Sequence, residues 1–372
     1  MKWLYGILCL FFLILFHEFG HFIAAKIFGV KVESFSIGFG PVLLHKKIRG
    51  TDWRLSLIPL GGYCGMKGEK EMTKAIETNT ALEAEPDSLY GVHPLKRACI
   101  GFTGPFFNFI FAVFAFTVIS IVGYNYYSYS NKITLVDEIY PEMHSAARDG
   151  GILSGDEIIA INGKKMNDFQ DILTTVSINP DKNLEITVLR EGFEKTFTVH
   201  SDFDKETGSG KIGVSADTKS LVQKKSVTYS FFPALLHGTK EAFEMVILTI
   251  KSIGILFKGV EIKNAVSGPA RVTDILGTTV QDGFSAGIKT GIVSILDLMA
   301  IISISLFIMN LLPVPILDGG LILFAVIEAV FHKKIPPKVQ YYAQFVGIAF
   351  IAVLLIIGTT GDVSYFIQKL KK

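Results

Sequence analysis

The stretch FFLILFHEFGH, residues 11–21, places His17, Glu18 and His21 inside an apolar run. This run continues on both sides and leaves 23 residues, 3–25, between Lys2 and Lys26. About 20 apolar residues in helical conformation cross the hydrocarbon core of a bilayer, so the segment predicts a transmembrane helix. An ionisable side chain at that depth costs about 3 kcal/mol on insertion scales. Three of them within positions 17–21 therefore indicate a functional site.

Three more apolar runs of spanning length follow, at residues 98–123, about 290–312 and about 339–361. Of the 372 residues 49% are hydrophobic, and the mean hydropathy is +0.43. This hydropathy is too high for an ordinary soluble domain. The sequence therefore predicts a mainly α-helical polytopic membrane protein with four transmembrane helices.

Composition excludes two classes of protein. The net charge is only +2, and no basic stripe is interleaved with aromatic residues, so no nucleic-acid partner is expected. Cys9, Cys64 and Cys99 lack CxxC spacing, which argues against a disulfide framework or a thiolate metal site.

Basic residues in the short connections predict the orientation in the membrane. From Lys26 to Arg97 there are 11 basic against 8 acidic residues, and residues 331–338 hold three lysines and no acid. Both connections are therefore predicted to be cytoplasmic, which places the N-terminus and residues 124–230 outside. The tail KLKK, residues 369–372, would also lie outside, which disagrees with the rule that basic residues favour the cytoplasmic side.

The N-terminal membrane segment, residues 1–124, contains the first two spans and a predicted β-hairpin at residues 31–66. Glycine and proline interrupt short β-prone runs there, and the runs are too apolar for a solvated loop. Backbone at membrane depth must be buried or line a cavity, which favours a hairpin that re-enters the membrane beside protein. A cytoplasmic hairpin resting on the bilayer is the alternative. Residues 67–92 contain six acidic residues and predict a solvated, mobile loop.

Three further segments follow the second span. Residues 131–215 predict a small α+β domain, with strands in ITLVDEI, DEIIAING, LEITVLR and KTFTVH and a helix in NDFQDILTTVSI. Residues 226–262 predict an amphipathic helix that lies in the membrane interface, although a fifth span is the alternative. Residues 284–372 form the C-terminal membrane segment with the third and fourth spans.

The spacing of the two histidines predicts a metal site. Residues four apart project from one face of a helix, so His17 and His21 can bind one ion. HExxH is the two-ligand half of a hydrolytic zinc site, and its glutamate, here Glu18, works on the bound water. A catalytic zinc ion usually has a third protein ligand. The acids and histidines that could supply it from another span are Asp297, Asp318, Glu328, His332 and Asp362.

Asp318 is the preferred third ligand because it falls on the same, inner side of the membrane as the histidines. It lies in NLLPVPILDGG, residues 310–320, where Pro313 and Pro315 break the third span. A broken helix at membrane depth is expected around a site rather than in plain packing. The alternative is that Asp318 caps the helix that follows. Asn310 could bind a substrate backbone or tie two helices together.

HEFGH in the first span and NLLPVPILDGG in the third resemble the paired signature of the site-2 protease family of intramembrane zinc metalloproteases, most closely its RseP-like branch. GFG at 38–40, HPLKRACIGFTGPFFN at 93–108 and SGPA at 267–270 extend the resemblance over the whole chain. It implies that His17, His21 and Asp318 bind Zn²⁺, that Glu18 is catalytic, and that residues 34–60 form a membrane re-entrant hairpin whose edge accepts an extended substrate. Substrate contacts are expected at Asn310, Gly38, Phe39, Gly40, Pro313 and Pro315.

The same resemblance covers the inserted domain. PEMHSAARDGGILSGDEIIAINGKKM, residues 141–166, is similar to a PDZ domain, and residues 131–215 have room for only one, whereas some relatives have two. The domain is expected either to capture the C-terminal carboxylate of a substrate or to reject substrates with intact ectodomains. The glycines at 150–155 favour capture.

The resemblance also implies a location and a substrate class. The protein is expected to be a multi-pass protein of the bacterial inner membrane, with the PDZ domain on the periplasmic side and the zinc site near the cytoplasmic side. Its substrates would be single-pass membrane proteins such as anti-sigma factors, or signal-peptide remnants.

Two other functions remain open from the sequence. A zinc transporter would show further ligands along several spans and internal repeats, and neither is seen. A catalytically silent membrane scaffold would be expected to lack the glutamate or a ligand, yet all four residues are present.

Overall fold

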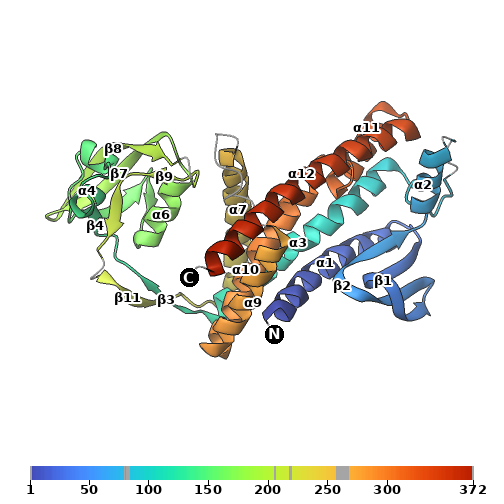
Figure 1. The fold of residues 1–372 in the computed structure, drawn as a ribbon, viewed down its shortest axis with the longest axis horizontal. Coiled ribbons are helices and arrows are strands. Elements are labelled where there is room, and N and C mark those ends of the chain that lie inside the picture. The colour runs from blue at the N-terminus through green and yellow to red at the C-terminus, as the bar shows by residue number, and fades with distance from the viewer. Residues whose placement is uncertain are drawn as a thin grey trace. The chain divides into compact units, whose positions relative to one another are not determined.

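The computed structural model describes residues 2–78, 80, 84–204, 207–217, 220–256 and 268–370. The chain divides into two compact units. One comprises residues 1–122, 229–246 and 267–372, and the other residues 123–228 and 247–266. The first unit is mainly helical and the second contains most of the short strands (Figure 1).

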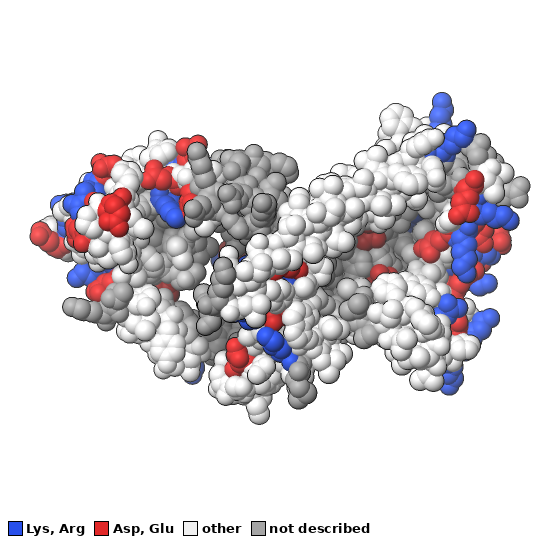
Figure 2. Space-filling model, viewed as in Figure 1, with Lys and Arg blue, Asp and Glu red and all other residues white. Residues whose placement is uncertain are grey.

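Among the described residues, four helices are long and apolar enough to cross a membrane, as the sequence predicts: α1 (Lys2–Ile27), α3 (Pro94–Val122), α10 (Ile288–Asn310) and α12 (Pro337–Leu370). All four begin one to four residues earlier than the apolar runs, and α12 also ends nine residues later, because polar residues at the ends continue the helix. Figure 2 shows an almost uncharged surface along α12, while acidic and basic side chains gather at α2 and the hairpin turn. The first unit therefore has the composition and helix lengths of a polytopic membrane protein.

The core of the helical unit lies where α1, α3 and α10 meet. Leu13, Phe111 and Ala300 are buried there and belong to one apolar cluster. The Ser303 hydroxyl donates a hydrogen bond to Asn108 O over 2.9 Å, which joins α10 to α3. Gly20 lets α1 approach α3 closely, since a Cβ at this position would lie 2.5 Å from Thr103 O. Small residues at such contacts bring backbones together in membrane helices, and here they fix the face of α1 that carries the histidines.

The segment after α1 is a β-hairpin, as predicted, formed by β1 (Val32–Ile48) and β2 (Thr51–Met66). Arg49 and Gly50 have φ angles of 48° and 83°, which a two-residue turn with positive φ at both positions requires. Residues 34–37 pair with 52–55 on one side and with 62–65 on the other, so they lie inside the sheet. The segment 61–66 therefore forms an edge of the sheet beside α1. Residues 34–37, at the start of the predicted substrate-binding segment 34–60, are paired on both sides and do not form an edge.

The prediction of a loop over residues 67–92 is wrong in part. Residues Glu69–Thr78 form helix α2, and Met72, Ala75 and Leu89 are buried. The acidic residues favour a solvated loop in the sequence, whereas in the structure α2 packs against α12 and buries Met72 and Ala75. Residues 79 and 81–83 lie outside the described residues.

The third span ends where the prolines predict. Helix α10 ends at Asn310, and α11 (Asp318–Phe331) begins seven residues after Leu311. A Cβ at Gly319 would lie 2.1 Å from Leu312 O, so only glycine permits this tight return of the chain. The break brings the first residue of α11, Asp318, into the interior of the unit.

The amphipathic helix predicted at 226–262 is α7 (Phe231–Leu256), and residues 257–262 lie outside the described part of the chain. It is not among the candidate membrane spans of the described residues, so the alternative of a fifth span finds no support. Its first half packs on α3, where a Cβ at Gly238 would lie 2.6 Å from Thr117 N. The helix α9 (Pro269–Ser285) follows and packs against the start of α1.

The second unit is a small α+β domain. Its central sheet has the order β6-β5-β7-β8-β9, and two further pairs join β4 to β10 and β3 to β11. The strands are β3 (Asn125–Ser128), β4 (Ile133–Leu135), β5 (Glu157–Ile161), β6 (Lys164–Lys165), β7 (Lys182–Arg190), β8 (Phe193–Phe203), β9 (Gly210–Lys211), β10 (Val214–Ala216) and β11 (Val222–Lys225), and the helices are α4 (Val136–Ile139), α5 (Ala146–Asp149) and α6 (Phe169–Ser177). Because β3 and β11 pair, the chain enters and leaves the domain side by side.

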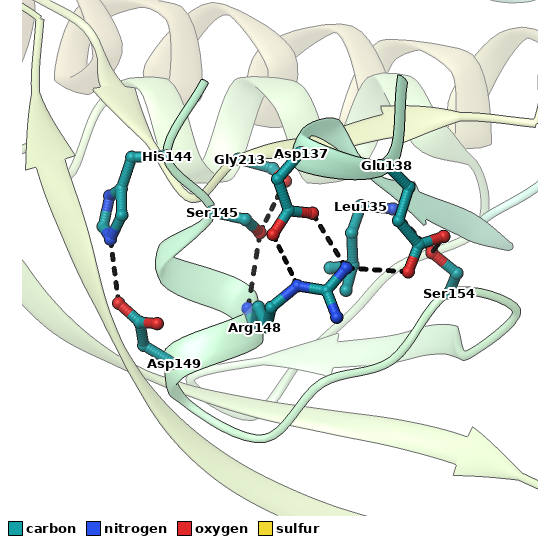
Figure 3. A network of polar contacts seen from close by, with 9 residues as sticks. All are labelled: Leu135, Asp137, Glu138, His144, Ser145, Arg148, Asp149, Ser154 and Gly213. Carbon is teal, nitrogen blue, oxygen red and sulfur yellow. Dashed lines mark hydrogen bonds and ion pairs between the residues drawn. The ribbon is translucent and has the colours of Figure 1, made fainter. Parts of the chain in front are cut away.

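One strand prediction in this domain is wrong over half of its length. ITLVDEI is a strand only over Ile133–Leu135, and its second half is α4. Figure 3 shows why: Arg148 Nη2 lies 3.0 Å from Asp137 Oδ1 and 2.8 Å from Glu138 Oε1. Both acids lie in the first turn of α4, where carboxylates stabilise a helix.

Candidate metal centre

Three side chains from two distant segments meet inside the helical unit. His17 Nε2 lies 3.1 Å from Asp318 Oδ2, and His21 Nε2 lies 3.2 Å from Asp318 Oδ1. The two Nε2 atoms are 3.3 Å apart. Both histidines are buried, with 8% and 6% of their surface exposed. Within the described part of the chain, this is the one group of three or more such residues whose ligand atoms converge.

The hydrogen bond at His21 Nδ1 leaves its Nε2 available as a metal ligand. Nδ1 lies 2.8 Å from Ile100 O, which can only accept, so Nδ1 donates and the neutral ring has a lone pair on Nε2. A metal ion beside that nitrogen and the Asp318 carboxylate would bind both groups. Four tetrahedral ligands at about 2.0 Å from zinc lie about 3.3 Å from one another. The observed separations of 3.1, 3.2 and 3.3 Å fit that donor set.

Asn108 on α3 contacts His17, the other histidine of the centre. Its amide nitrogen is 3.1 Å from His17 Nδ1, while its own Oδ1 is buried without a partner among the described residues. The two ends of an amide are interchanged by a half-turn about its last bond. That rotation makes Oδ1 the acceptor of the His17 Nδ1 proton and leaves Nε2 free for a metal. Oriented ring nitrogens of this kind are typical of metal-binding histidines.

The other candidates for a third ligand have different places. Asp297 is exposed on α10, and His332 is exposed and ends α11 in the left-handed conformation, with φ of 52°. Glu328 is buried and paired with Arg97. Asp362 accepts hydrogen bonds from Gly268 N and Ala270 N, which caps α9. The alternative role of Asp318 as a helix cap is wrong, because Leu317 is the N-cap residue of α11 and Asp318 contacts the histidines.

Glu18 is half-buried and hydrogen-bonded to the hairpin. Its Oε2 accepts the N–H of Cys64 at 3.0 Å. This bond ties the glutamate to the edge segment 61–66. The sequence excluded a disulfide or thiolate role for Cys64 but predicted no contact with Glu18, and it assigned no role to Asn108, Ile100 or Gly104. The stretch at 93–108, which the family resemblance already marks, contains the last three.

The predicted substrate contacts lie in the hairpin and at the break after α10. Phe39 is 42% exposed and stacks on Tyr63, and Gly38 and Gly40 flank it with φ of 91° and 84°. Asn310 and Pro315 are half-buried and Pro313 is exposed, all at or just after the end of α10. Their contact with substrate stays a prediction.

Comparison with known proteins agrees with this constellation. The sequence profile of peptidase family M50 matches residues 5–354. Three bacterial relatives are each named as a candidate zinc metalloprotease. The protein of Treponema pallidum is 34% identical over 446 aligned residues, which cover 98% of this chain and 99% of the relative. That of Campylobacter jejuni is 36% identical, with 99% and 94% covered, and that of Helicobacter pylori strain 26695 is 33% identical, with 96% and 98% covered.

Proposed function

This chain belongs to peptidase family M50, the site-2 protease family, and is a zinc metalloprotease, and we propose that it hydrolyses peptide bonds within the membrane-spanning segments of single-pass membrane proteins. The observation that supports this proposal most directly is the convergence of His17, His21 and Asp318 beside Glu18, with the two histidines and the glutamate on a helix of spanning length. His17, His21 and Asp318 would bind the zinc ion through two imidazole nitrogens and a carboxylate. When bound, zinc supplies Lewis acidity, which lowers the pKa of water and stabilises negative charge on a carbonyl oxygen.

Glu18 is the general base and then the general acid. It takes a proton from the water that attacks the scissile carbonyl and gives it to the leaving amine. The Cys64 N–H engages Oε2 at 3.0 Å, which leaves Oε1 to carry the proton. Because the same backbone bond fixes the carboxylate relative to His17 on the preceding position of α1, Glu18 is oriented before substrate arrives.

Substrate unwinding follows from the helix geometry of the substrate. A helical segment hides its carbonyl groups in hydrogen bonds, so cleavage requires a short extended stretch whose backbone finds new partners. We assign this role to the hairpin, whose edge segment 61–66 adjoins Glu18 through Cys64. Pairing of an extended peptide with a free strand edge would replace the lost bonds. Gly38, Phe39, Gly40, Asn310, Pro313 and Pro315 would line the same path.

The inserted domain is proposed to be a PDZ domain that selects substrates. It contains a cavity of about 510 Å³ between α6 and the segment 210–214. Phe169, Ile172 and Val176 give one wall an apolar character suited to a peptide side chain. Gly150, Gly151 and Gly155 do not line this cavity, so capture of a substrate C-terminus is proposed for the cavity rather than for the glycines. Deleting residues 131–215 distinguishes this role from a size filter: lost cleavage of trimmed substrates supports capture, and faster cleavage of untrimmed ones supports the filter.

The proposed setting is the bacterial inner membrane. The hairpin would re-enter the bilayer on the cytoplasmic side, the zinc site would lie near that side, and the N-terminus and inserted domain would lie outside. Labelling of single cysteines placed at Lys46 in the hairpin turn and at Lys195 in the domain, with a reagent that does not cross membranes, tests this orientation. We expect modification of intact cells at position 195 and none at position 46.

The decisive test of catalysis uses Glu18→Gln in the full chain. We expect the variant to retain zinc, because the three ligand side chains are unchanged, and to lose cleavage of membrane proteins. The membrane proteomes of cells with either form would reveal substrates as proteins that accumulate with the variant. Cleavage retained in Glu18→Gln would contradict the assigned role, and zinc uptake by vesicles that depends on His17 would instead favour a transporter. Full retention of cellular function by Glu18→Gln would favour a scaffold.

A further inference from the structure

A polar cavity lies at the start of α3, on the N-terminal side of Ile100 and Asn108, which contact the metal centre. It has a volume of about 390 Å³ and opens between the start of α3 and the end of α11. This size is within the range of small-ligand sites. Its lining includes Tyr90, His93, Arg97, Glu328, Lys333 and Lys334. Figure 2 shows basic side chains at the end of the helical unit where α11 meets α12.

The charge around this cavity is strongly positive. Among its described lining residues Glu328 is the only acid, and both of its oxygens are engaged. Oε2 accepts from Arg97, and Oε1 accepts from Ile335 N at 3.0 Å. Lys333 and Lys334 are exposed at the mouth. The charged side chains that line the cavity therefore have a net positive charge.

Arg97 provides an independent sign of a missing ligand. Its side chain is only 4% exposed, and its guanidinium packs over the Tyr90 ring with 5.1 Å to the ring centre. Within the described ranges its Nε has no hydrogen-bond partner. A buried guanidinium with an unused donor is costly unless an acceptor enters the site.

One more donor points to an anion. His93 Nδ1 accepts the N–H of Leu95 at 3.2 Å, so in the neutral ring the proton is on Nε2, which is then a donor. The N–H groups of Lys96 and Arg97 in the first turn of α3 already donate to His93 O, at 2.9 and 3.2 Å, so the donors that face a ligand are side chains. Arginine, lysine and imidazole are usual partners of a phosphoryl group.

We propose that this cavity binds the phosphoryl group of an anionic ligand, held by Arg97, His93, Lys333 and Lys334. The chemistry is shared by the headgroup of an anionic phospholipid and by free phosphate. The site lies at the same end of α3 as the connections that are predicted to be cytoplasmic, where basic pockets between membrane helices bind anionic headgroups. A bound headgroup would join α3 to α11, the helix that begins with Asp318.

A simpler role for the lysines is to neutralise the C-terminal end of α11, where cations stabilise a helix. That role makes the stability of the protein depend on Lys333 and Lys334 in every lipid. The proposed site makes the stability depend on these lysines only when a phosphoryl ligand is present. The two roles therefore differ in a measurable way.

The test compares the full chain with the variant Lys333→Gln/Lys334→Gln. A matched control, Lys46→Gln/Lys47→Gln, removes the same charge from an exposed pair at the hairpin turn. Each protein is placed in nanodiscs of phosphatidylcholine with or without phosphatidylglycerol, and retained lipids are counted by native mass spectrometry. In a second arm, the unfolding midpoint is measured in detergent with sodium phosphate or with sodium chloride at equal ionic strength.

We expect saturable binding of phosphatidylglycerol to the wild type and to the hairpin control. The cavity variant should bind about 25-fold more weakly, as expected for the loss of two lysines that each contribute about a factor of five near an anionic surface. Phosphate stabilisation that depends on Lys333 and Lys334, without retained lipid, would identify free phosphate as the ligand. Equal effects of the two double variants in both arms, or no specific binding of either probe, would overturn the proposal. Neither readout depends on peptide cleavage, so the result is independent of the proposed function.

Discussion

Gly104 is the residue whose replacement tests the geometry of the metal centre most sharply. It faces His21 across the contact between α1 and α3, and a Cβ at this position would lie 2.2 Å from His21 Nε2 and 2.4 Å from Cε1. Non-bonded heavy atoms approach to about 3.5 Å, so Gly104→Ala requires a movement of about 1 Å. Ile100 O anchors the other ring nitrogen of His21 at 2.8 Å, and therefore the ring has little freedom to yield without losing its orientation.

The expected loss follows from that displacement. A ligand moved by about 1 Å from its productive position lowers activity by about 100-fold, and overpacking itself costs about 1–3 kcal/mol. We expect Gly104→Ala to remain helical in circular dichroism, to contain less zinc by elemental analysis, and to cleave a fluorescent membrane-spanning reporter at least about 100-fold more slowly.

Gly101→Ala is the matched control on the same helix. Its Cβ would meet two side-chain atoms that can shift by a few tenths of an ångström, Ile322 Cγ1 at 3.1 Å and Leu321 Cδ2 at 3.3 Å, and would lie in ordinary contact with Asp318 O at 3.5 Å. We expect it to keep at least half of the wild-type activity and its zinc. Wild-type zinc content and cleavage in folded Gly104→Ala would show that the contact between α1 and α3 does not position His21.

Three further substitutions probe the surroundings of the site and the inserted domain. Asn108→Ala removes the partner of His17 Nδ1 at 3.1 Å and should weaken zinc binding by about 10–100-fold. Competition with a chelating dye measures this affinity, and an unchanged affinity would exclude the orienting role of Asn108. Cys64→Pro removes the N–H that binds Glu18 and should abolish cleavage of the reporter while zinc is retained. The control Cys64→Ala keeps that N–H and should stay active. Equal activity of the two variants would refute the role of this bond. Burial raises the pKa of the Asp156 carboxyl, but the hydrogen bonds from Arg190 at 2.7 Å and from Leu153 N outweigh it, so the pKa is lowered overall. Asp156→Asn should therefore destabilise the domain by about 2–4 kcal/mol at pH 7. Because the folded-state pKa of Asp156 is depressed, this stabilisation is complete above its unfolded pKa of about 4 and disappears as the pH falls through the folded value. Pulse proteolysis of the full chain from pH 7 to pH 3 measures the difference, and a difference that does not shrink in acid would contradict the assignment.

Much of the fold is predictable because it depends on local patterns. The apolar runs alone place the four long helices to within a few residues at most ends, and proline and glycine at 313–320 predict the break after Asn310. Helix α2 and helix α4 were missed for a related reason. The acidic residues of α2 suggest a loop, and the sequence of α4 is compatible with a strand. Contacts with other parts of the chain, such as that of Arg148 with Asp137, stabilise the helix instead.

The sequence by itself determined the chemistry of the centre, because the four-residue spacing of His17 and His21 is a property of any helix. It did not determine which of five acids and histidines would join them, since their distances from the histidines depend on how the helices pack. Only the tertiary structure placed Asp318 beside the rings of His17 and His21. It also gave Glu328 and Asp362 other partners, Arg97 and Gly268 N. The tertiary structure likewise brought Asn108, Ile100 and the Cys64 N–H to the site. Contacts between residues 46 to 301 positions apart depend on the close approach of helices at small residues, which no local pattern encodes.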